Sequence, residues 1–212
     1  MRDCQICGAV SAKCIVPFYA GSLYRLYECG ICGHRYVDSP ALSQSALDRY
    51  YLEVYKTDDK PYSNERLNSL AACVASRSMR VLDIGGTDGE LQSRVNRIGT
   101  ICDVVGVEIT ETGRYDGVIL SHTLEHIYDL KAMLDRVKTN LVDDGYLFIE
   151  VPIHSNPYLA PEEYDYHYQH INKFRVIDLE RLVRENGFDV LVSEPLPDYR
   201  EYHCHRLIGQ KA

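Results

Sequence analysis

The segment from Val81 to Gly89 constrains the fold more than any other part of the sequence. It reads V-L-D-I-G-G-T-D-G, a short apolar run that leads into a glycine-rich turn. The run predicts a buried strand and the residues from Gly89 to Arg97 predict a helix, so the glycines stand where the chain turns from strand to helix. The exposed N–H groups at the start of such a helix attract an anionic group. The segment therefore predicts a strand–turn–helix unit that binds a charged ligand.

Strands and helices alternate through the rest of the chain. The patterns predict strands at Val104–Ile109, Tyr115–Leu120 and Tyr146–Val151, helices at Leu130–Leu141 and Val176–Asn186, and a closing antiparallel pair at Phe188–Glu194 and Tyr202–Ile208. This alternation is typical of a doubly wound α/β sheet. The 212 residues are enough for one such domain and a small appendage.

Glu108 ends the predicted strand that follows the turn, nineteen residues beyond Gly89. An acidic side chain at this place can accept hydrogen bonds from both ribose hydroxyls of a nucleoside. The combination of Asp83, Gly85 and Glu108 is therefore more informative than a glycine turn alone. A turn that serves only packing is the alternative.

These motifs resemble those of the class I S-adenosylmethionine (SAM)-dependent methyltransferases, whose first motif commonly reads D/E-x-G-x-G-x-G, with Thr87 here replacing the middle glycine. Tyr115–Leu120 followed by H-T-L-E-H is similar to the family's "fDvI…vLEH" segment, and Leu141–Leu147 is similar to its "LkpGG.l" turn. The resemblance covers roughly residues 80–195 and implies a Rossmann-like methyltransferase sheet. It implies that SAM contacts Asp83, Gly85, Gly86, Thr87, Asp88, Gly89, Glu108, Ile109, Ser121 and His122.

Four of the eight cysteines form two C-x-x-C pairs near the N-terminus. Cys4 and Cys7 are separated from Cys29 and Cys32 by 21 residues, and a glycine follows each pair. Two such turns complete the tetrahedral shell of one Zn²⁺ ion. A shell of four thiolates has no open position, so we expect a structural ion that holds a small module together. A zinc ribbon that grips nucleic acid is the alternative.

A closer resemblance is to the sugar C-methyltransferases, which also begin with a zinc module of two C-x-x-C pairs. Their glycine turn G-S-N-D-G is similar to Gly85–Gly89, and their active-site segment H-E-H-x-x-x-F is similar to His167–Phe174. The resemblance implies a small-molecule acceptor, such as a sugar or nucleotide sugar. We expect no counterpart here of their large C-terminal domain, which helps to hold the nucleotide sugar.

The same segment supplies the candidate catalytic residues. His170 is the candidate general base, because imidazole removes protons near neutral pH, and His167 and Tyr168 lie in the same polar loop. His126 is a second polar candidate at the start of the segment after the third recognisable strand. For both His126 and His170, a purely structural hydrogen bond is the alternative.

The chain departs from the methyltransferase pattern between its second and third predicted strands. Only a short connection, which includes residues 111–115, separates the second strand from Asp116, where the family inserts a helix and a strand. In the family's strand order 3-2-1-4-5-7-6, the missing strand lies at the edge. We expect that a homodimer or a partner protein covers the exposed edge, or that cofactor affinity is weakened.

Three segments organise the chain: a zinc-binding module at 1–38, a helical connector or lid at 39–78 that carries Tyr50, Tyr51, Tyr55 and Tyr62, and the Rossmann-like domain at 79–212. The net charge is −8, and segment 1–38 shows no basic stripe, so we expect no nucleic-acid partner. No apolar run reaches the ~18 residues of a membrane span, so we expect a cytoplasmic protein without a membrane contact.

Two other functions are compatible with parts of the sequence. His122, Glu125 and His126 match the H-x-x-E-H arrangement of inverted-motif zinc peptidases, but that function would leave the glycine turn without a role. A non-catalytic methyltransferase-like subunit or scaffold would need only the exposed sheet edge. Catalysis instead requires Gly85, Glu108 and the loop after Tyr146–Val151 to meet at one site.

Overall fold

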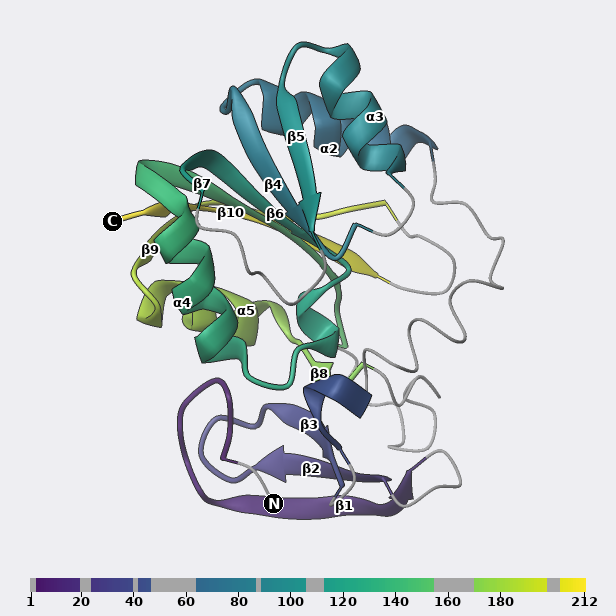
Figure 1. Ribbon diagram of the computed structural model, residues 1–212. Coiled ribbons are helices and arrows are strands. Elements are labelled where there is room, and N and C mark those ends of the chain that lie inside the picture. Colours follow the sequence, from purple (N-terminus) through teal and green to yellow (C-terminus); the bar gives the residue numbers. More distant parts are fainter. Residues whose placement is uncertain are drawn as a thin grey trace.

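Two β-sheets of unequal size organise the protein (Figure 1). The computed structural model describes residues 3–19, 24–39, 42–46, 64–86, 89–105, 113–154, 170–197 and 203–212. In Figure 1 a six-stranded sheet with its helices forms the larger body, and the strands β1, β2 and β3 lie below it. Of the predicted helical connector at 39–78, residues 39, 42–46 and 64–78 are described, and the tyrosines expected to form a lid lie outside the described residues.

The large sheet has the strand order β5-β4-β6-β7-β10-β9. Its strands are β4 (Arg80–Ile84), β5 (Ile101–Val105), β6 (Tyr115–Ser121), β7 (Leu141–Pro152), β9 (Phe188–Pro195) and β10 (Cys204–Lys211). The first four run parallel, and β10 is antiparallel to both β7 and β9. The predicted closing pair is therefore confirmed. The described order is the expected 3-2-1-4-5-7-6 without its third strand, and β5 is its edge.

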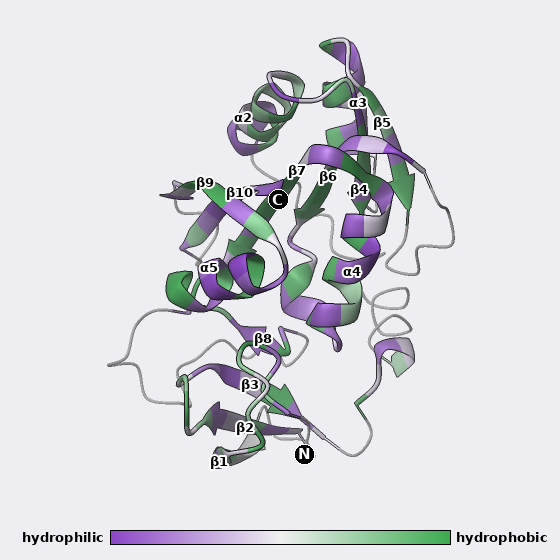
Figure 2. Ribbon diagram, turned by 90° about the vertical axis from the view of Figure 1, so that its left-hand side faces the viewer, coloured by the Kyte–Doolittle hydropathy of each residue, from purple (hydrophilic) through white to green (hydrophobic). Residues whose placement is uncertain are grey.

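Helices cover both faces of this sheet. The helices α2 (Asn64–Ala75) and α3 (Glu90–Arg97) pack on one face, and α4 (Leu130–Asn140) and α5 (Val176–Glu185) pack on the other (Figure 1). Alternation along β6 illustrates the division, because Val118 and Leu120 point to the α4 and α5 side while Ile119 points to the α2 and α3 side. Figure 2 shows the central strands as a largely hydrophobic layer between the helices. None of the helices in the described ranges is long and apolar enough to cross a membrane.

The start of strand β5 and the segment between α4 and β7 differ from the prediction. Strand β5 begins at Ile101 instead of Val104, because the chain reverses at Gly99, which has φ 92°, and pairs with β4 at once. Helix α4 ends at Asn140, and the next residue already pairs with Tyr115 in the sheet. The turn implied by the resemblance at Leu141–Leu147 is thus an irregularity inside β7, where Asp144 has φ 59°.

The small sheet combines strands from both ends of the chain. The strands β1 (Ala12–Tyr19), β2 (Tyr24–Cys29) and β3 (Arg35–Asp38) come from the N-terminal segment. The fourth strand, β8 (Asn172–Lys173), pairs antiparallel with β3. The segment 1–38, predicted as a module of its own, therefore shares its sheet with the C-terminal half of the chain.

A buried ion cluster also holds the N-terminal segment against helix α5. The His34 ring is fully buried, and its Nδ1 lies 3.3 Å from the Asp178 carboxylate. Arg175 donates to the same carboxylate from Nε at 2.9 Å and from Nη2 at 2.6 Å, and its Nη2 also donates to the Cys32 carbonyl. Burial opposes ionisation of Asp178, but these hydrogen bonds outweigh it and lower its pKa to about 2. The cluster therefore joins α5 to one of the cysteine turns.

Replacing Asp178 with Asn should destabilise the protein at neutral pH by roughly 2 kcal/mol, the free energy that corresponds to the lowered pKa. A carboxyl whose pKa is lower in the folded state than in the unfolded state stabilises the fold above its unfolded pKa of 3.8. The difference between wild type and variant should therefore stay constant from pH 7 to about pH 4 and shrink below it. Urea unfolding at several pH values measures this difference.

The matched control is Asp135→Asn, because Asp135 is exposed and pairs with Lys138 on the surface of α4. We expect this variant to change stability by less than about 0.5 kcal/mol at any pH. An Asp178→Asn variant as stable as wild type at pH 7 would show that the cluster contributes nothing to folding.

Candidate functional site

The glycine turn at the carboxyl end of β4 has the backbone that the sequence predicts. Gly85 has φ 85°, and its N–H donates to the Val105 carbonyl at 2.9 Å, which joins the turn to the end of β5. A Cβ at Gly85 would lie 2.8 Å from Thr123 Oγ1, so only glycine fits. Gly89, with φ 70°, is the N-cap of α3. The strand, the two glycines and the helix thus form the expected unit, while Thr87 and Asp88 lie outside the described residues.

Asp83 packs against this turn from within the sheet. Its side chain is buried, with 4% of the residue exposed. A Cβ at Gly86 would lie only 2.5 Å from Asp83 Oδ2, so the carboxylate lies directly against the Gly86 backbone. The second glycine is therefore required by the close approach of an acidic side chain, a reason that the motif alone does not reveal.

The end of β6 lies beside the glycine turn. Thr123 Oγ1 donates to the Ile84 carbonyl at 2.9 Å, and the His122 N–H donates to the Glu150 carbonyl at 2.7 Å. His122 has φ 52°, an unfavourable conformation for a residue with a side chain, and such conformations gather at functional sites. The structure thus brings Asp83, Gly85, Gly86, Ser121 and His122 to the carboxyl ends of adjacent strands, where ligands bind in open α/β sheets.

The predicted ribose-binding strand end is described only in part. Val105 is the last described residue of β5, and it contacts Gly85 through the hydrogen bond above. Glu108 and Ile109 lie outside the described residues. Glu108 follows Val105 by three positions, so the roles of both residues remain predictions.

A buried cluster of two arginines and one glutamate lies next to Ser121 at the end of β6. The sequence did not lead us to predict it. Arg66 Nε donates to Glu150 Oε2 at 2.9 Å, and Arg206 donates to Glu150 Oε1 from Nε at 2.9 Å and from Nη2 at 2.6 Å. Arg66 also donates to Ser121 Oγ at 2.7 Å. One feature of the sequence indicated such a cluster: the apolar run L-F-I-E-V of β7 contains a single acid. A charged residue in a buried strand needs a partner of opposite charge. The cluster fixes Ser121 and attaches α2 to the sheet.

A second polar cluster lies just beyond the end of β6. Glu125 is fully buried in the short 3-10 helix η2 (Leu124–His126), and its Oε1 lies 3.4 Å from His122 Nδ1 and 3.8 Å from His126 Nε2. Burial raises the pKa of Glu125 to about 7. The ring of His126 meets the ring of His170 edge to face at 4.7 Å between centroids. The structure thus joins the two candidate catalytic histidines.

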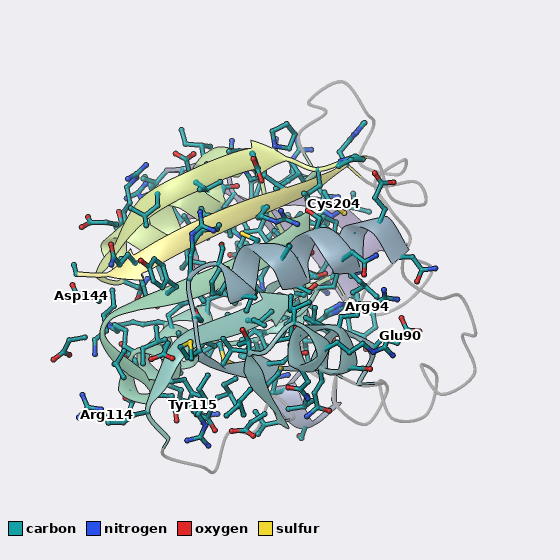
Figure 3. All side chains as sticks on the ribbon, turned by 90° about the horizontal axis from the view of Figure 1, so that it is seen from above. Glu90, Arg94, Arg114, Tyr115, Asp144 and Cys204 are labelled. Carbon is teal, nitrogen blue, oxygen red and sulfur yellow. The ribbon has the colours of Figure 1, made fainter. Side chains whose placement is uncertain are left out.

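The other predicted residues of the catalytic loop are not described. His167 and Tyr168 lie outside the described residues. Cys204, which no motif singled out, has its Sγ 3.8 Å from His122 Nε2. Figure 3 places Cys204 at the end of the sheet opposite to Asp144, and so on the side of the strand ends described above.

The four paired cysteines meet as the sequence predicts. Cys4 Sγ lies 3.6 Å from Cys32 Sγ, and Cys7 Sγ lies 3.6 Å from Cys29 Sγ, while all four sulfurs lie within 4.8 Å of one another. Sulfurs at the corners of a tetrahedral zinc site lie about 3.8 Å apart. The following glycines, Gly8 with φ 69° and Gly33 with φ 73°, close two turns of the same kind. These residues could hold one metal ion.

The chemistry of the four thiols also fits a cation. Burial raises the pKa of Cys4 to about 11 and also raises that of Cys32. Cys29 is also partly desolvated, but hydrogen bonds from the backbone N–H groups of Cys32 and Ile31 lower its pKa to about 7. Burial thus opposes ionisation of Cys4 and Cys32, whereas a bound divalent cation holds its cysteine ligands as thiolates.

Replacing Gly85 with Ala should destabilise the protein by about 1–3 kcal/mol more than Gly99→Ala. Both variants force alanine into a positive φ, but only the new Cβ at position 85 also clashes with Thr123. Gly99, with φ 92° and no heavy atom within 4 Å of its Cβ position, isolates the backbone strain. Thr123→Ala should recover part of the loss in the Gly85→Ala background. A double-mutant cycle of urea unfolding measures the coupling, and additive effects would contradict the contact.

The comparisons with known proteins agree on one fold. The family model described as "Methyltransferase domain" matches residues 57–193. No curated protein matches the chain.

Solved structures of methyltransferases superpose on most of the chain. The 1,6-didemethyltoxoflavin-N1-methyltransferase of Burkholderia thailandensis, with its substrate and S-adenosylhomocysteine (SAH) bound, has a TM-score of 0.64 at 19% identity, covering 85% of this chain and 96% of that one. The magnesium protoporphyrin IX methyltransferase of Synechocystis with bound SAH has a TM-score of 0.56 at 12% identity, covering 80% and 100%. A SAM-dependent methyltransferase of Thermotoga maritima gives 0.52 at 17%, covering 79% and 96%. The fold is thus α/β and Rossmann-like, with a mixed sheet.

Proposed function

The chain belongs to the methyltransferase domain family, whose model spans residues 57–193, and on that premise we propose that it transfers a methyl group from SAM to a small-molecule acceptor. The observation that carries the proposal is the meeting of the glycine turn after β4 with the end of β6, at Gly85 and Thr123. The toxoflavin and protoporphyrin methyltransferases, which have the same fold, act on small molecules and carry bound SAH. A sugar or nucleotide sugar is the acceptor that the N-terminal cysteine pairs and the segment His167–Phe174 favour.

The residues around the turn fit a SAM molecule. Gly85 and Gly86 leave no room for side chains, so the turn presents its backbone, and the first N–H groups of α3 would face the methionyl carboxylate. We propose that Asp83, Gly85, Gly86, Thr87, Asp88, Gly89, Ser121 and His122 line this part of the site, with Glu108 and Ile109 at the ribose and adenine. When bound, SAM supplies an electrophilic methyl group on its sulfonium.

The histidine pair beyond β6 is the proposed site of acceptor activation. His126 and His170 are both buried and in ring contact, and His122, between them and the turn, is a proposed SAM contact. His170 would take the acceptor's proton as the acceptor attacks the methyl group in line, with His126, His167 and Tyr168 orienting the acceptor. Gln169 stands where the resembling family has an acid, so a carboxylate at that position is not part of the proposal.

Replacing Glu108 with Ala should weaken SAH binding by about 30- to 100-fold, because two hydrogen bonds from the ribose hydroxyls to a carboxylate are lost. Isothermal titration of the purified protein with SAH measures the change. Glu111→Ala, which removes an acid three positions further along, is the matched control and should bind SAH as wild type does. A wild-type chain that binds neither SAH nor SAM would favour the non-catalytic scaffold instead.

We propose that Cys4, Cys7, Cys29 and Cys32 bind one structural Zn²⁺ ion. The single observation behind this proposal is the approach of the four sulfurs to within 4.8 Å of one another, and Arg175 and His34 join the site to α5. Cys29→Ser should lower zinc from one atom per chain toward zero and lower the melting temperature by several degrees. Cys14→Ser is the control, because Cys14 is exposed and should leave both values unchanged. Elemental analysis that finds no zinc in wild type would contradict the proposal.

The edge of the large sheet is the proposed contact for another chain. Among the described residues, β5 pairs with β4 and with no strand on its other side. An exposed edge strand offers N–H and carbonyl groups to a further strand. A second copy or a partner protein at β5 therefore remains our prediction.

A further inference from the structure

A second set of metal-ligating side chains lies apart from the four cysteines. Glu125, His126 and His170 each offer one ligand atom, and these atoms lie within 4.8 Å of one another. All three residues are buried, with exposed fractions of 0%, 7% and 8%. We propose that they bind a divalent transition-metal cation beside the site of methyl transfer.

The Glu125 carboxylate is the strongest indication. It is fully buried, and neither of its oxygens accepts a hydrogen bond within the described part of the chain. The nearby Arg66 directs its guanidinium to Glu150 and Ser121 instead. A buried carboxylate without hydrogen bonds is strongly unfavourable unless it is neutralised or paired with a cation. A metal ion would supply that charge at short range.

The donors suit a particular class of cation. Two imidazoles and one carboxylate form the three-ligand set that binds Fe²⁺, Mn²⁺, Co²⁺ or Zn²⁺ and leaves open positions for other ligands. The present separation of 3.8 Å between Glu125 Oε1 and His126 Nε2 is too long for a hydrogen bond. Ligand atoms around one such cation lie about 3.0–3.5 Å apart, since each metal–ligand distance is about 2.1 Å. Because the three ligand atoms lie within 4.8 Å of one another, side-chain shifts of roughly 1–2 Å would complete the site.

The backbone around the three ligands is already fixed. Glu125 and His126 lie on η2, while His170 precedes β8 by two positions. Asn172, fully buried in β8, donates from its Nδ2 to the Leu124 carbonyl at 3.1 Å and to the Ile127 carbonyl at 2.8 Å. These two bonds hold the ends of η2 against the segment that carries His170. The ligands therefore come from two segments joined by a buried amide, as a preformed site requires.

The inference adds to the proposed function and, in its catalytic consequence, rests on it. A cation with an open position would coordinate an acceptor oxygen and lower its pKa. The acceptor's proton would then leave to solvent or to a nearby imidazole such as His154, whose ring lies 6.3 Å from that of His170. In that case His170 holds the cation and does not act as the free base.

Cobalt titration tests the proposal on the whole chain. Dialysis against a weak chelator should empty a site of two imidazoles and one carboxylate, while zinc stays on the four thiolates. Co²⁺ added to this protein should bind at one equivalent and give d–d bands without a sulfur-to-cobalt charge-transfer band. It should also raise the melting temperature of wild type. Wild type that gains no such bands would overturn the proposal.

The variants identify the ligands. Glu125→Gln keeps the shape of the side chain and removes its charge, and His170→Asn removes an imidazole, so each should weaken Co²⁺ binding by more than about 100-fold. His205→Gln is the matched control, because His205 is also buried but contacts Ser193 at the other edge of the sheet, and it should bind Co²⁺ as wild type does. Co²⁺ binding by Glu125→Gln with wild-type affinity would exclude this site.

SAH titration of the same proteins separates this inference from the proposed function. Glu125→Gln should retain wild-type SAH affinity, which also shows that the variant is folded. Cobalt binding without SAH binding would leave the metal site standing and overturn the methyl-transfer proposal. SAH binding without cobalt binding would do the reverse and leave His170 as the base.

Discussion

The antiparallel pairing of β3 with β8 is the contact on which the arrangement of both sites depends. It joins Arg35 and Tyr36, which directly follow the second cysteine turn, to Lys173 and Asn172. Asn172 in turn holds η2 through two buried hydrogen bonds. The four-cysteine cluster, the 3-10 helix after β6 and the segment of His170 are therefore parts of one connected structure. The ion cluster of His34, Arg175 and Asp178 reinforces the same junction from α5.

Two buried glutamates near the ends of the parallel strands have opposite surroundings. Glu150 receives hydrogen bonds from Arg66 and Arg206 on both of its oxygens, so its charge is compensated within the protein. Glu125 Oε1 lies 3.4 Å from His122 Nδ1 and 3.8 Å from His126 Nε2, and the carboxylate has no hydrogen bond among the described residues. Removing one partner of a paired buried charge strongly destabilises the fold. A buried charge without hydrogen-bonding partners already destabilises the wild-type fold. The first arrangement serves the fold, and the second suits a ligand.

The sequence predicts the parts of the structure that depend on local geometry. Gly85 and Gly89 require positive φ, and the two C-x-x-C pairs specify their own turns, so both features are visible in a short window. The order of the large sheet followed from the strand–helix alternation and the family resemblance. What could not be predicted depends on long-range contacts: β8 is two residues long and has no pattern of its own, and the pairing of Glu150 with Arg66 joins residues 84 positions apart. The start of β5 was missed because Asp103 interrupts the apolar run I-C-D-V-V.

The strand β8 also has a consequence for how the protein is made. During synthesis the N-terminal segment leaves the ribosome long before residue 173 exists, and its sheet then lacks the fourth strand. Domains usually fold as they emerge, but this segment depends on a pairing that spans more than a hundred residues, and such non-local contacts form slowly. A nascent cysteine pair can capture its ion early, yet the edge of β3 stays open until the C-terminal half arrives. Completion of the N-terminal sheet therefore waits for the segment that carries β8, and it forms together with the site of His170.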